Sequence, residues 1–363
     1  MNCLYYKVIL KLKYMLYNLD EICIIPAKTT DIEHRSDVVI YNSHNKLPLF
    51  AAPMHCIINT ENRKSFEDQG INTIIPRTVM WEERIKYIKL GAWTAVGFEE
   101  AACIYYTYDY DKCPKIRICI DQANGHMNKL LELCSKLKDK FEDRIRIMTG
   151  NIANPYSYKE YARAGIDFVR VGIGGGGACT TSVQTGIHYP MGSLIFNCYE
   201  QKLQVRKEIA LGAKYKSVPK IVADGGISRI DQAVKALALG ADYVMLGKVF
   251  AQTEEACGDY ELVYSTLNNK HIKYREYFGM STEKAQNLIN DAALNPVLNF
   301  VPKHSEGIVT QVKVECNLND WINDFEHAFR SCMSYINARN LKEFIGKAQY
   351  GIMSSGTLHN YLK

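Results

Sequence analysis

Through the middle of this 363-residue chain, eight short β-rich runs alternate with stretches of helical pattern. Most of the runs are continuously apolar, which is typical of parallel strands that are covered on both faces. In such an alternation each helix carries the chain back before the next strand begins, so neighbouring strands run parallel. The eight expected strands span residues 48–53, 73–77, 93–98, 116–121, 145–151, 168–174, 220–226 and 243–248.

The stretches between these runs are predicted to form amphipathic helices. Two of these helices are expected over residues 81–91 and 230–240. Gly91, Gly165 and Gly240 fall where a helix should end and the chain should turn into a strand. The clearest helix, over residues 127–141, has apolar side chains at helical spacing, namely Met127, Leu130, Leu131, Cys134, Leu137 and Phe141.

Eight strands interleaved with helices favour an α/β fold of the closed (β/α)₈ or TIM-barrel type over an open sheet. A doubly wound open sheet would want a G-x-G-x-x-G turn after its first strand. The chain instead reads Met54-His55-Cys56 there. One barrel domain is therefore expected over residues 19–363, with residues 1–18 as an extension. An irregular stretch at 288–307 and a helix near 321–337 are expected to form a lid and closing segment.

Composition narrows the possible partners. The net charge is only +5, and no basic run carries interleaved aromatics, so nucleic acid is not the expected partner. Lys7, Lys11 and Lys13 interrupt the apolar N-terminus, which predicts no membrane span. The 12 cysteines form no C-x-x-C pair and no Cys/His cluster at metal-ligand spacing, so they indicate reduced thiols in a cytoplasmic protein.

A glycine-rich loop with a cysteine follows the sixth expected strand. Residues 172–181 read Gly-Ile-Gly-Gly-Gly-Gly-Ala-Cys-Thr-Thr. The loop after a barrel strand lies at the face where this fold carries its active sites. Its free backbone can present carbonyls to a monovalent cation, and Cys179 is placed to act as a nucleophile. The alternative is a flexible loop with an incidental cysteine, since free cysteines are usually packing residues.

Two further motifs follow the last two strands. Asp224-Gly225-Gly226-Ile227-Ser228 comes after the seventh strand, and Met245-Leu246-Gly247-Lys248 after the eighth. These loops form the usual phosphate site of α/β barrels, and glycine amides suit a phosphate dianion. Asp224 is suited to accept hydrogen bonds from ribose hydroxyls. Alternatively, the first motif is a tight turn in which Ser228 merely caps the next helix.

Taken together with residues 277–281 (Tyr-Phe-Gly-Met-Ser) and Ser305-Glu306-Gly307, these motifs resemble the IMP dehydrogenase/GMP reductase family from about residue 19 to 350. Within it the chain looks like the reductases. Arg77 leads directly into the 81–91 helix, which leaves no room for the regulatory CBS modules of the dehydrogenases. Residues 121–126 (Asp-Gln-Ala-Asn-Gly-His) and 330–335 are similar to reductase segments. Residues 295–303 lack the Arg-Tyr pair with which dehydrogenases activate water.

The resemblance implies reductive deamination of GMP to IMP and ammonia by NADPH, through a thioimidate on Cys179, with Thr181 and Glu306 transferring protons. It implies a homotetramer, and possible K⁺ binding by the backbone of Gly174, Gly176 and Cys179. The substrate residues it implies are Asp224, Gly225, Gly226, Gly247, Lys248, Gly279, Met280, Ser281, Lys303, Ser305 and Gly307. The cofactor residues it implies are Lys28, Arg77, Asp121, Gln122, Ala123, Asn151, Ser331 and Ser334.

Four positions depart from the family pattern. His55 stands where the family usually has Asp, Lys303 and Ser182 stand where the reductases have Arg, and the glycine run replaces a G-x-G-S pattern. Three alternatives are open: an IMP dehydrogenase without regulatory modules, a flavin-dependent barrel, and a catalytically silent purine nucleotide sensor. The first is opposed by Glu306 and the missing Arg-Tyr pair, the second by the cysteine loop, and the third is favoured by His55 and Ser182.

Overall fold

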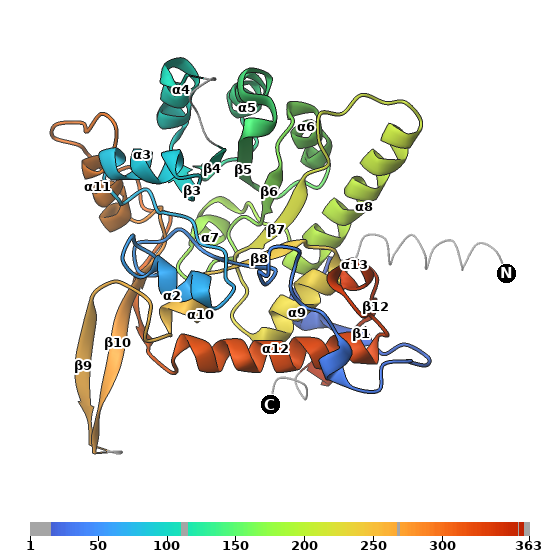
Figure 1. Cartoon of the computed structure of the whole chain (residues 1–363). Coiled ribbons are helices and arrows are strands. Elements are labelled where there is room, and N and C mark those ends of the chain that lie inside the picture. Colours follow the sequence, from blue (N-terminus) through green and yellow to red (C-terminus); the bar gives the residue numbers. More distant parts are fainter. Residues whose placement is uncertain (1–15, 110–114, 267–268, 355, 359–363) are drawn as a thin grey trace.

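The computed structural model describes residues 16–109, 115–266, 269–354 and 356–358. Nearly all of the expected N-terminal extension therefore lies outside the described residues. At the centre, seven parallel strands form one curled sheet in the order β2-β8-β7-β6-β5-β4-β3, wrapped by helices (Figure 1). The strands are β2 (Leu49–Ala51), β3 (Trp93–Val96), β4 (Ile116–Asp121), β5 (Ile145–Ile152), β6 (Phe168–Val171), β7 (Lys220–Asp224) and β8 (Tyr243–Leu246).

Residues 72–75 join the two ends of this sheet and close the barrel. Asn72 bridges Phe50 of β2, and Ile75 bridges Thr94 of β3, both in parallel. The strand expected at 73–77 is thus reduced to two single bridges. Pro76, which has no N–H to donate, follows at once and stops the pairing from extending into a ladder. The predicted α/β barrel is confirmed, with one of its eight strands in this irregular form.

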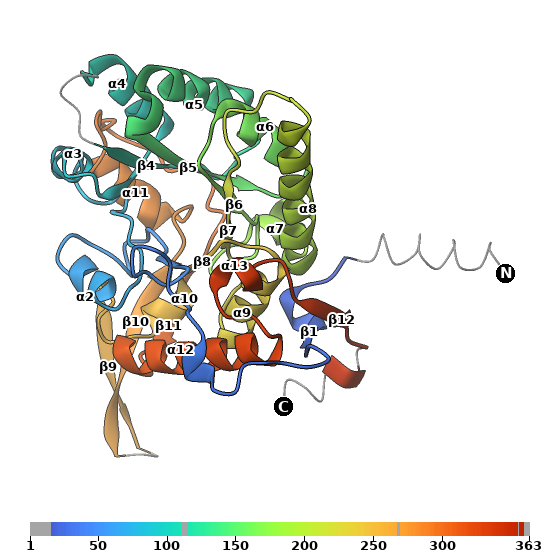
Figure 2. The ribbon, with the colours of Figure 1, turned by 45° about the vertical axis from the view of Figure 1, so that its right-hand side comes forward.

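The expected helices are confirmed on the outside of the barrel (Figures 1 and 2). The long helix α5 buries Leu130, Leu133, Cys134, Leu137 and Phe141, which lie at helical spacing. The covering helices are α2 (Arg63–Asp68), α3 (Trp81–Lys89), α4 (Phe98–Thr107), α5 (Asn128–Phe141), α6 (Ser157–Ala164), α8 (Met191–Ala210), α9 (Ile230–Leu239) and α12 (Leu318–Tyr335). None of the helices in the described part of the chain is both long enough and apolar enough to cross a membrane.

Aromatic side chains fill the N-terminal end of the barrel. Phe50, Trp93, Phe168 and Tyr243 come from four strands and meet mostly edge to face, with ring centroids 5.1–6.4 Å apart. Side chains alternate along a strand, so the residue two positions after Phe168 also points into the barrel. That residue is Arg170, and it lies one layer closer to the mouth where the site is built.

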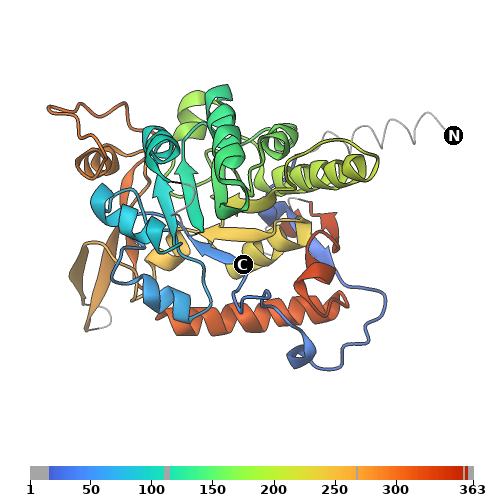
Figure 3. The same cartoon turned by 45° about the horizontal axis from the view of Figure 1, so that its top comes forward.

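The chain after β8 adds elements that sequence reasoning did not anticipate. The strands β9 (Tyr260–Ser265), β10 (Lys270–Phe278) and β11 (Val309–Lys313) form an antiparallel sheet, from which the β9–β10 hairpin projects (Figure 1). Between β10 and β11 lie α11 (Glu283–Asp291) and an irregular segment, residues 292–308, here called the flap. The helix α12 then runs along one side of the molecule (Figure 3).

Short elements complete the chain. Near its two ends, β1 (Ile22–Ile25) pairs with β12 (Gln349–Ile352) in antiparallel register. The remaining pieces are α7 (Thr181–Thr185), α10 (Lys248–Ala251), α13 (Leu341–Phe344) and the 3₁₀ turns η1 (Leu19–Glu21), η2 (Arg35–Asp37) and η3 (Glu142–Arg144).

Candidate active site

Cys179, Thr181 and Glu306 meet at the barrel mouth, as sequence analysis expected. The Cys179 Sγ lies 3.3 Å from the Thr181 Oγ1, and the Thr181 hydroxyl donates to the Glu306 Oε2 at 2.6 Å. The thiol, the hydroxyl and the carboxylate therefore form a continuous hydrogen-bonded chain. A proton can move along such a chain between the sulfur and the carboxylate.

Backbone pairing holds the flap against the cysteine loop. Cys179 and Gly307 form an antiparallel bridge, in which Thr180 N–H donates to the Glu306 carbonyl and Ile308 N–H donates to the Ala178 carbonyl, both at 2.9 Å. A Cβ at Gly307 would lie 2.8 Å from the Ala178 carbonyl oxygen, so glycine permits this approach. The S-E-G motif thus reaches the cysteine through main-chain contacts.

The loops after β7 and β8 lie beside the cysteine loop. A Cβ on Gly226 would lie 3.0 Å from the carbonyl oxygen of Gly175, and one on Gly177 would lie 3.7 Å from the Lys248 Cδ. Gly247 in turn faces the hydroxyl of Tyr277. Both motifs predicted to hold phosphate therefore contact the glycine run.

Other predicted substrate residues lie close to the C-terminal part of the cysteine loop and to the flap. Gly279 approaches the Ala178 carbonyl, and Ser281 lies beside Gly307. Lys303 is exposed on the flap, where its backbone N–H donates to the Gln286 Oε1 at 2.7 Å. Gln286 also donates to the carbonyls of Ser281 and Lys303, so one glutamine of α11 ties the residues after β10 to the flap.

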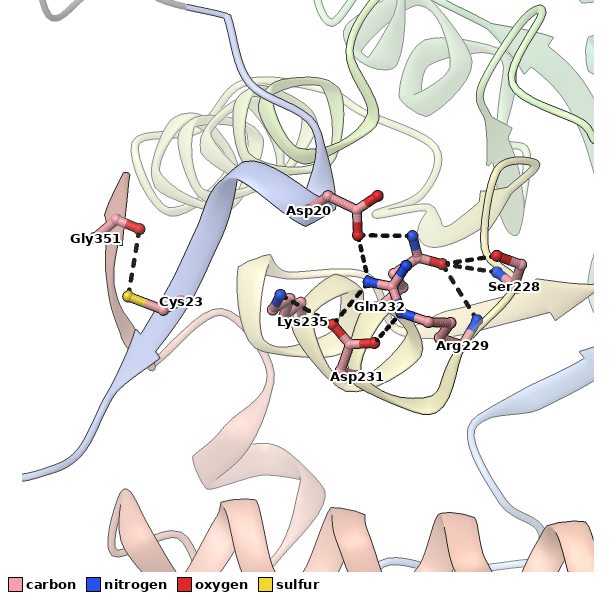
Figure 4. Close-up of polar contacts among 8 residues, drawn as sticks. All are labelled: Asp20, Cys23, Ser228, Arg229, Asp231, Gln232, Lys235 and Gly351. Carbon is pink, nitrogen blue, oxygen red and sulfur yellow. Dashed lines mark hydrogen bonds and ion pairs between the residues drawn. The ribbon is translucent and has the colours of Figure 1, made fainter. Parts of the chain in front are cut away.

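A network around η1 supports the loop after β7 (Figure 4). The Gln232 Oε1 accepts from the N–H of Ser228 at 2.8 Å and from the N–H of Arg229 at 3.2 Å. Gln232 in turn donates to the Asp20 Oδ1 at 2.9 Å, and Arg229 pairs with the same carboxylate. Ser228 is thus engaged by the first turn of α9, and Asp20 steadies that turn from the N-terminal side.

This network yields a first prediction. Asp20→Asn removes the charge that holds Arg229 and should raise the KM for the predicted nucleotide substrate at least about threefold, because the loop after β7, which is predicted to hold the phosphate, loses its support. The Asp20–Arg229 pair is partly exposed, so unfolding free energy should change by less than about 1 kcal/mol. Steady-state kinetics and thermal melting measure both effects. Asp139→Asn, which breaks a surface pair with Lys216, is the control; an equal rise in KM there would contradict the assignment.

Arg170 links three of the predicted ligand residues inside the barrel. Its Nη1 donates to the Asp121 Oδ1 at 2.5 Å, and its Nε and Nη2 donate to the Asp224 Oδ2 at 3.0 and 2.8 Å. The Asn151 Nδ2 donates to the same Asp224 oxygen at 2.8 Å. Asp121 was expected on the cofactor side and Asp224 on the substrate ribose, and one guanidinium spans both.

Charge pairing shifts the pKa values of Asp121 and Arg170 in this network. Burial opposes ionisation of the Asp121 carboxyl, but the Arg170 and Arg77 cations outweigh it and hold its pKa below the usual range. Burial likewise disfavours the Arg170 cation, and Asp224 and Asp121 outweigh it and hold that pKa above its ordinary value. Sequence reasoning missed Arg170, although a charged residue inside the apolar run Phe-Val-Arg-Val was a usable signal.

Arg77 and the loops after β4 and β5 lie near Asp121. The Arg77 Nη1 is 3.5 Å from the Asp121 carbonyl, whereas its Nε is buried without a hydrogen-bond partner in the described residues. Asn151 N–H donates to the Gln122 carbonyl at 3.2 Å, which joins the two loops. The residue between Gln122 and Asn124, Ala123, is exposed.

Three predicted cofactor residues form a separate group at the C-terminal end of α12. The Ser334 hydroxyl donates to the Ser331 carbonyl, and Thr30, two residues after the exposed Lys28, donates to the Ser334 carbonyl at 2.8 Å. The helix starts just after Cys316, which bridges Thr253 in the segment that follows β8. Within the described residues, Lys28, Ser331 and Ser334 make no direct hydrogen bond to the Cys179 group.

His55, a departure from the family pattern, faces Thr78 and Phe278. Its Nδ1 is 3.2 Å from the Thr78 hydroxyl, and its ring centroid is 6.1 Å from that of Phe278. Burial lowers the pKa of this imidazole, which favours the neutral ring at physiological pH. The position therefore adds no fixed charge to the mouth.

Comparisons with known proteins bear on this geometry. The model of the "IMP dehydrogenase / GMP reductase domain" matches residues 115–360. A GMP reductase of Buchnera aphidicola is 28% identical over 84% of this chain and 82% of its own length. A GMP reductase of Aliivibrio fischeri is 29% identical with the same coverage. An inosine-5'-monophosphate dehydrogenase of Aquifex aeolicus is 35% identical over 64% of this chain and 44% of its own length.

The match covers most of the barrel together with the cysteine loop, the two loops predicted to hold phosphate, and the flap. These parts come from distant stretches of the sequence, and the fold assembles them at one end of the sheet. The chain belongs to the IMP dehydrogenase/GMP reductase family.

Proposed function

We propose that this protein is a GMP reductase, which converts GMP and NADPH to IMP, ammonia and NADP⁺. The contact of Glu306 with the Thr181–Cys179 pair carries the proposal. A carboxylate at this position can pass a proton to a leaving amine, as reductive deamination requires. The flap residues 295–303 contain neither Arg nor Tyr, so they offer no pair to activate water for an IMP dehydrogenase reaction.

In the first half of the reaction, the Cys179 sulfur adds to C2 of the purine. The thiol proton passes through the Thr181 hydroxyl to Glu306 and then to the amino nitrogen of GMP. The C2–N bond breaks, ammonia leaves, and a thioimidate joins Cys179 to the purine. The proton that the thiol gives up is the one that the amine gains, so this half balances within the Cys179–Thr181–Glu306 chain. A covalent intermediate divides a difficult substitution into two easier steps.

In the second half, a hydride replaces sulfur at C2, and the thiolate leaves to take up a proton. NADPH, when bound, supplies that hydride. Asp121, Asn151 and Arg77 are proposed to hold it, because the unpartnered Arg77 Nε is a buried donor available to an anionic ligand. The substrate phosphate is proposed on the amides of Gly226 and Gly247 with Lys248 beside them, and Asp224 is proposed to bind the ribose hydroxyls.

Three further properties are proposals. The Gly174 carbonyl accepts the Ser182 hydroxyl at 3.1 Å and the Gly176 carbonyl accepts the Cys179 N–H at 2.9 Å. Each oxygen keeps a second lone pair with which it could bind K⁺. The proposed reaction steps do not involve this ion. The described cysteines are free thiols, which suits a reducing cytoplasm. The proposal that the protein forms a homotetramer rests on the family resemblance alone.

Paired assays test the direction of the chemistry. GMP with NADPH should turn over, whereas IMP with NAD⁺ should give no xanthosine monophosphate, because the thioimidate has no activated water to hydrolyse it. NADPH oxidation and chromatography of the nucleotides measure the two reactions. Xanthosine monophosphate formed at a rate comparable to reduction would favour the dehydrogenase. Nucleotide binding without either reaction would favour a silent sensor, the alternative that the departures from the family pattern at His55 and Ser182 suggest.

A further inference from the structure

Arg170 is the only charged residue of strand β6, and its side chain is 10% exposed. It lies between the last residues of β4 and β7, which are the carboxylates Asp121 and Asp224. Its three donor atoms are divided between the two carboxylates, with Nη1 on Asp121 and both Nε and Nη2 on Asp224. One guanidinium therefore fixes the orientation of both carboxylates at once.

The hydrogen bonds fall on one oxygen of each carboxylate. The Asp224 Oδ2 accepts from Arg170 twice and from Asn151 once. Within the described residues, the Asp224 Oδ1 and the Asp121 Oδ2 accept no hydrogen bond from the protein. Each carboxylate thus keeps one oxygen available to a hydroxyl group, and the other oxygen is held by the fork of Arg170.

We propose that Arg170 is a positioning residue for ribose recognition, which holds Asp224 and Asp121 so that each presents one free oxygen to a ribose hydroxyl. This inference rests on the proposed function, because Asp224 is there the ligand of the substrate ribose. Arg170 does not touch the reacting atoms. It acts through Asp224 on the nucleotide substrate and through Asp121 on the second nucleotide ligand.

The planar fork of arginine explains why this residue type suits the position. A guanidinium can donate in fixed directions to two carboxylates, whereas a lysine ammonium is a point charge on a flexible stem. Lysine at position 170 would keep a positive charge between the two carboxylates but would not fix their planes. Glutamine would keep a donor and remove the charge.

The experiment compares the binding of GMP with that of 2′,3′-dideoxy-GMP, measured by calorimetry on the full chain. The wild type should prefer GMP by at least about tenfold, the lower end for hydrogen bonds to a charged group. In Arg170→Lys the preference should fall to about threefold or less, because GMP loses affinity while dideoxy-GMP does not. Arg170→Gln serves if the lysine variant does not fold, and should show the same loss.

Arg146→Lys on the neighbouring strand β5 is the matched control, since Arg146 is half exposed and pairs with Asp167 away from the mouth. It should keep the wild-type preference. A purely structural role for Arg170 would weaken both nucleotides equally and leave the ratio unchanged, which would overturn the inference. A wild type with equal affinity for the two nucleotides would overturn it as well. Failure of the wild type to bind GMP at all would instead refute the proposed function.

Discussion

Cys179→Ala is expected to abolish turnover of GMP with NADPH, with a loss on the order of 10⁴-fold or more, as when a covalent nucleophile is removed. Both ammonia release and hydride transfer should disappear, because each half of the reaction makes or breaks the bond between C2 and the sulfur. Ammonia, NADPH oxidation and hydride transfer from IMP to NADP⁺ should be measured separately in the same preparation.

The same variant should still bind GMP. The proposed phosphate and ribose contacts come from Gly226, Gly247 and Asp224. These residues lie at or just after the ends of β7 and β8 and do not belong to the loop that carries Cys179. Cys103→Ala is the control, since this half-buried thiol lies on α4 beside Thr107. It should keep full activity. Turnover that survives in Cys179→Ala would refute the covalent mechanism and with it the assigned role of the glycine loop.

Glu306→Gln should slow deamination of GMP on the order of 10²–10⁴-fold, the usual cost of losing a positioned acid or base. Glutamine has nearly the same shape and can still accept from the Thr181 hydroxyl, so the loop geometry should persist. Hydride transfer between IMP and NADP⁺ should be spared, because it moves no proton to or from an amino nitrogen. It is best measured at mildly alkaline pH, so that hydroxide in solution can take the thiol proton in place of Glu306.

The separation of the two steps is the informative result. Glu315→Gln, on an exposed residue just after β11, is the control and should change neither rate. Equal slowing of deamination and hydride transfer in Glu306→Gln would mean that Glu306 binds substrate or supports the flap. The acid–base assignment would then be wrong even if the reductase reaction itself persisted.

Sequence patterns predicted most of the barrel because its strands are buried on both faces and read as apolar runs. The prediction of a regular second strand over residues 73–77 was wrong in detail, since Pro76 limits the pairing to single bridges at Asn72 and Ile75. The antiparallel sheet of β9, β10 and β11 could not be anticipated in the same way. Most of β9 is exposed, with apolar residues such as Leu262 and Val263 on it, so its pattern does not follow one buried face.

The candidate site divides along similar lines. Cys179, Thr181 and Glu306 were predicted to act together, and their contacts confirm that they meet, although their chemical roles stay predictions. Arg170 was missed, because a motif search favours loops and this residue lies within a strand. Lys28, Ser331 and Ser334 were named as cofactor residues by resemblance alone; Ser331 and Ser334 lie in the last turns of α12, Lys28 lies two residues before Thr30, which bonds the Ser334 carbonyl, and their role stays a prediction. No local sequence pattern indicates where these three residues lie relative to Asp121.

Trapping the covalent intermediate tests the central claim most directly. The protein should be mixed with IMP and NADP⁺, quenched in acid, digested and mapped by mass spectrometry. Hydride removal from IMP should leave the purine on sulfur, and the adduct should accumulate because no water is activated to hydrolyse it. The account predicts a nucleotide adduct on the peptide that contains Cys179 and on no other cysteine. Hydride transfer without an adduct, or an adduct on a different cysteine, would contradict it.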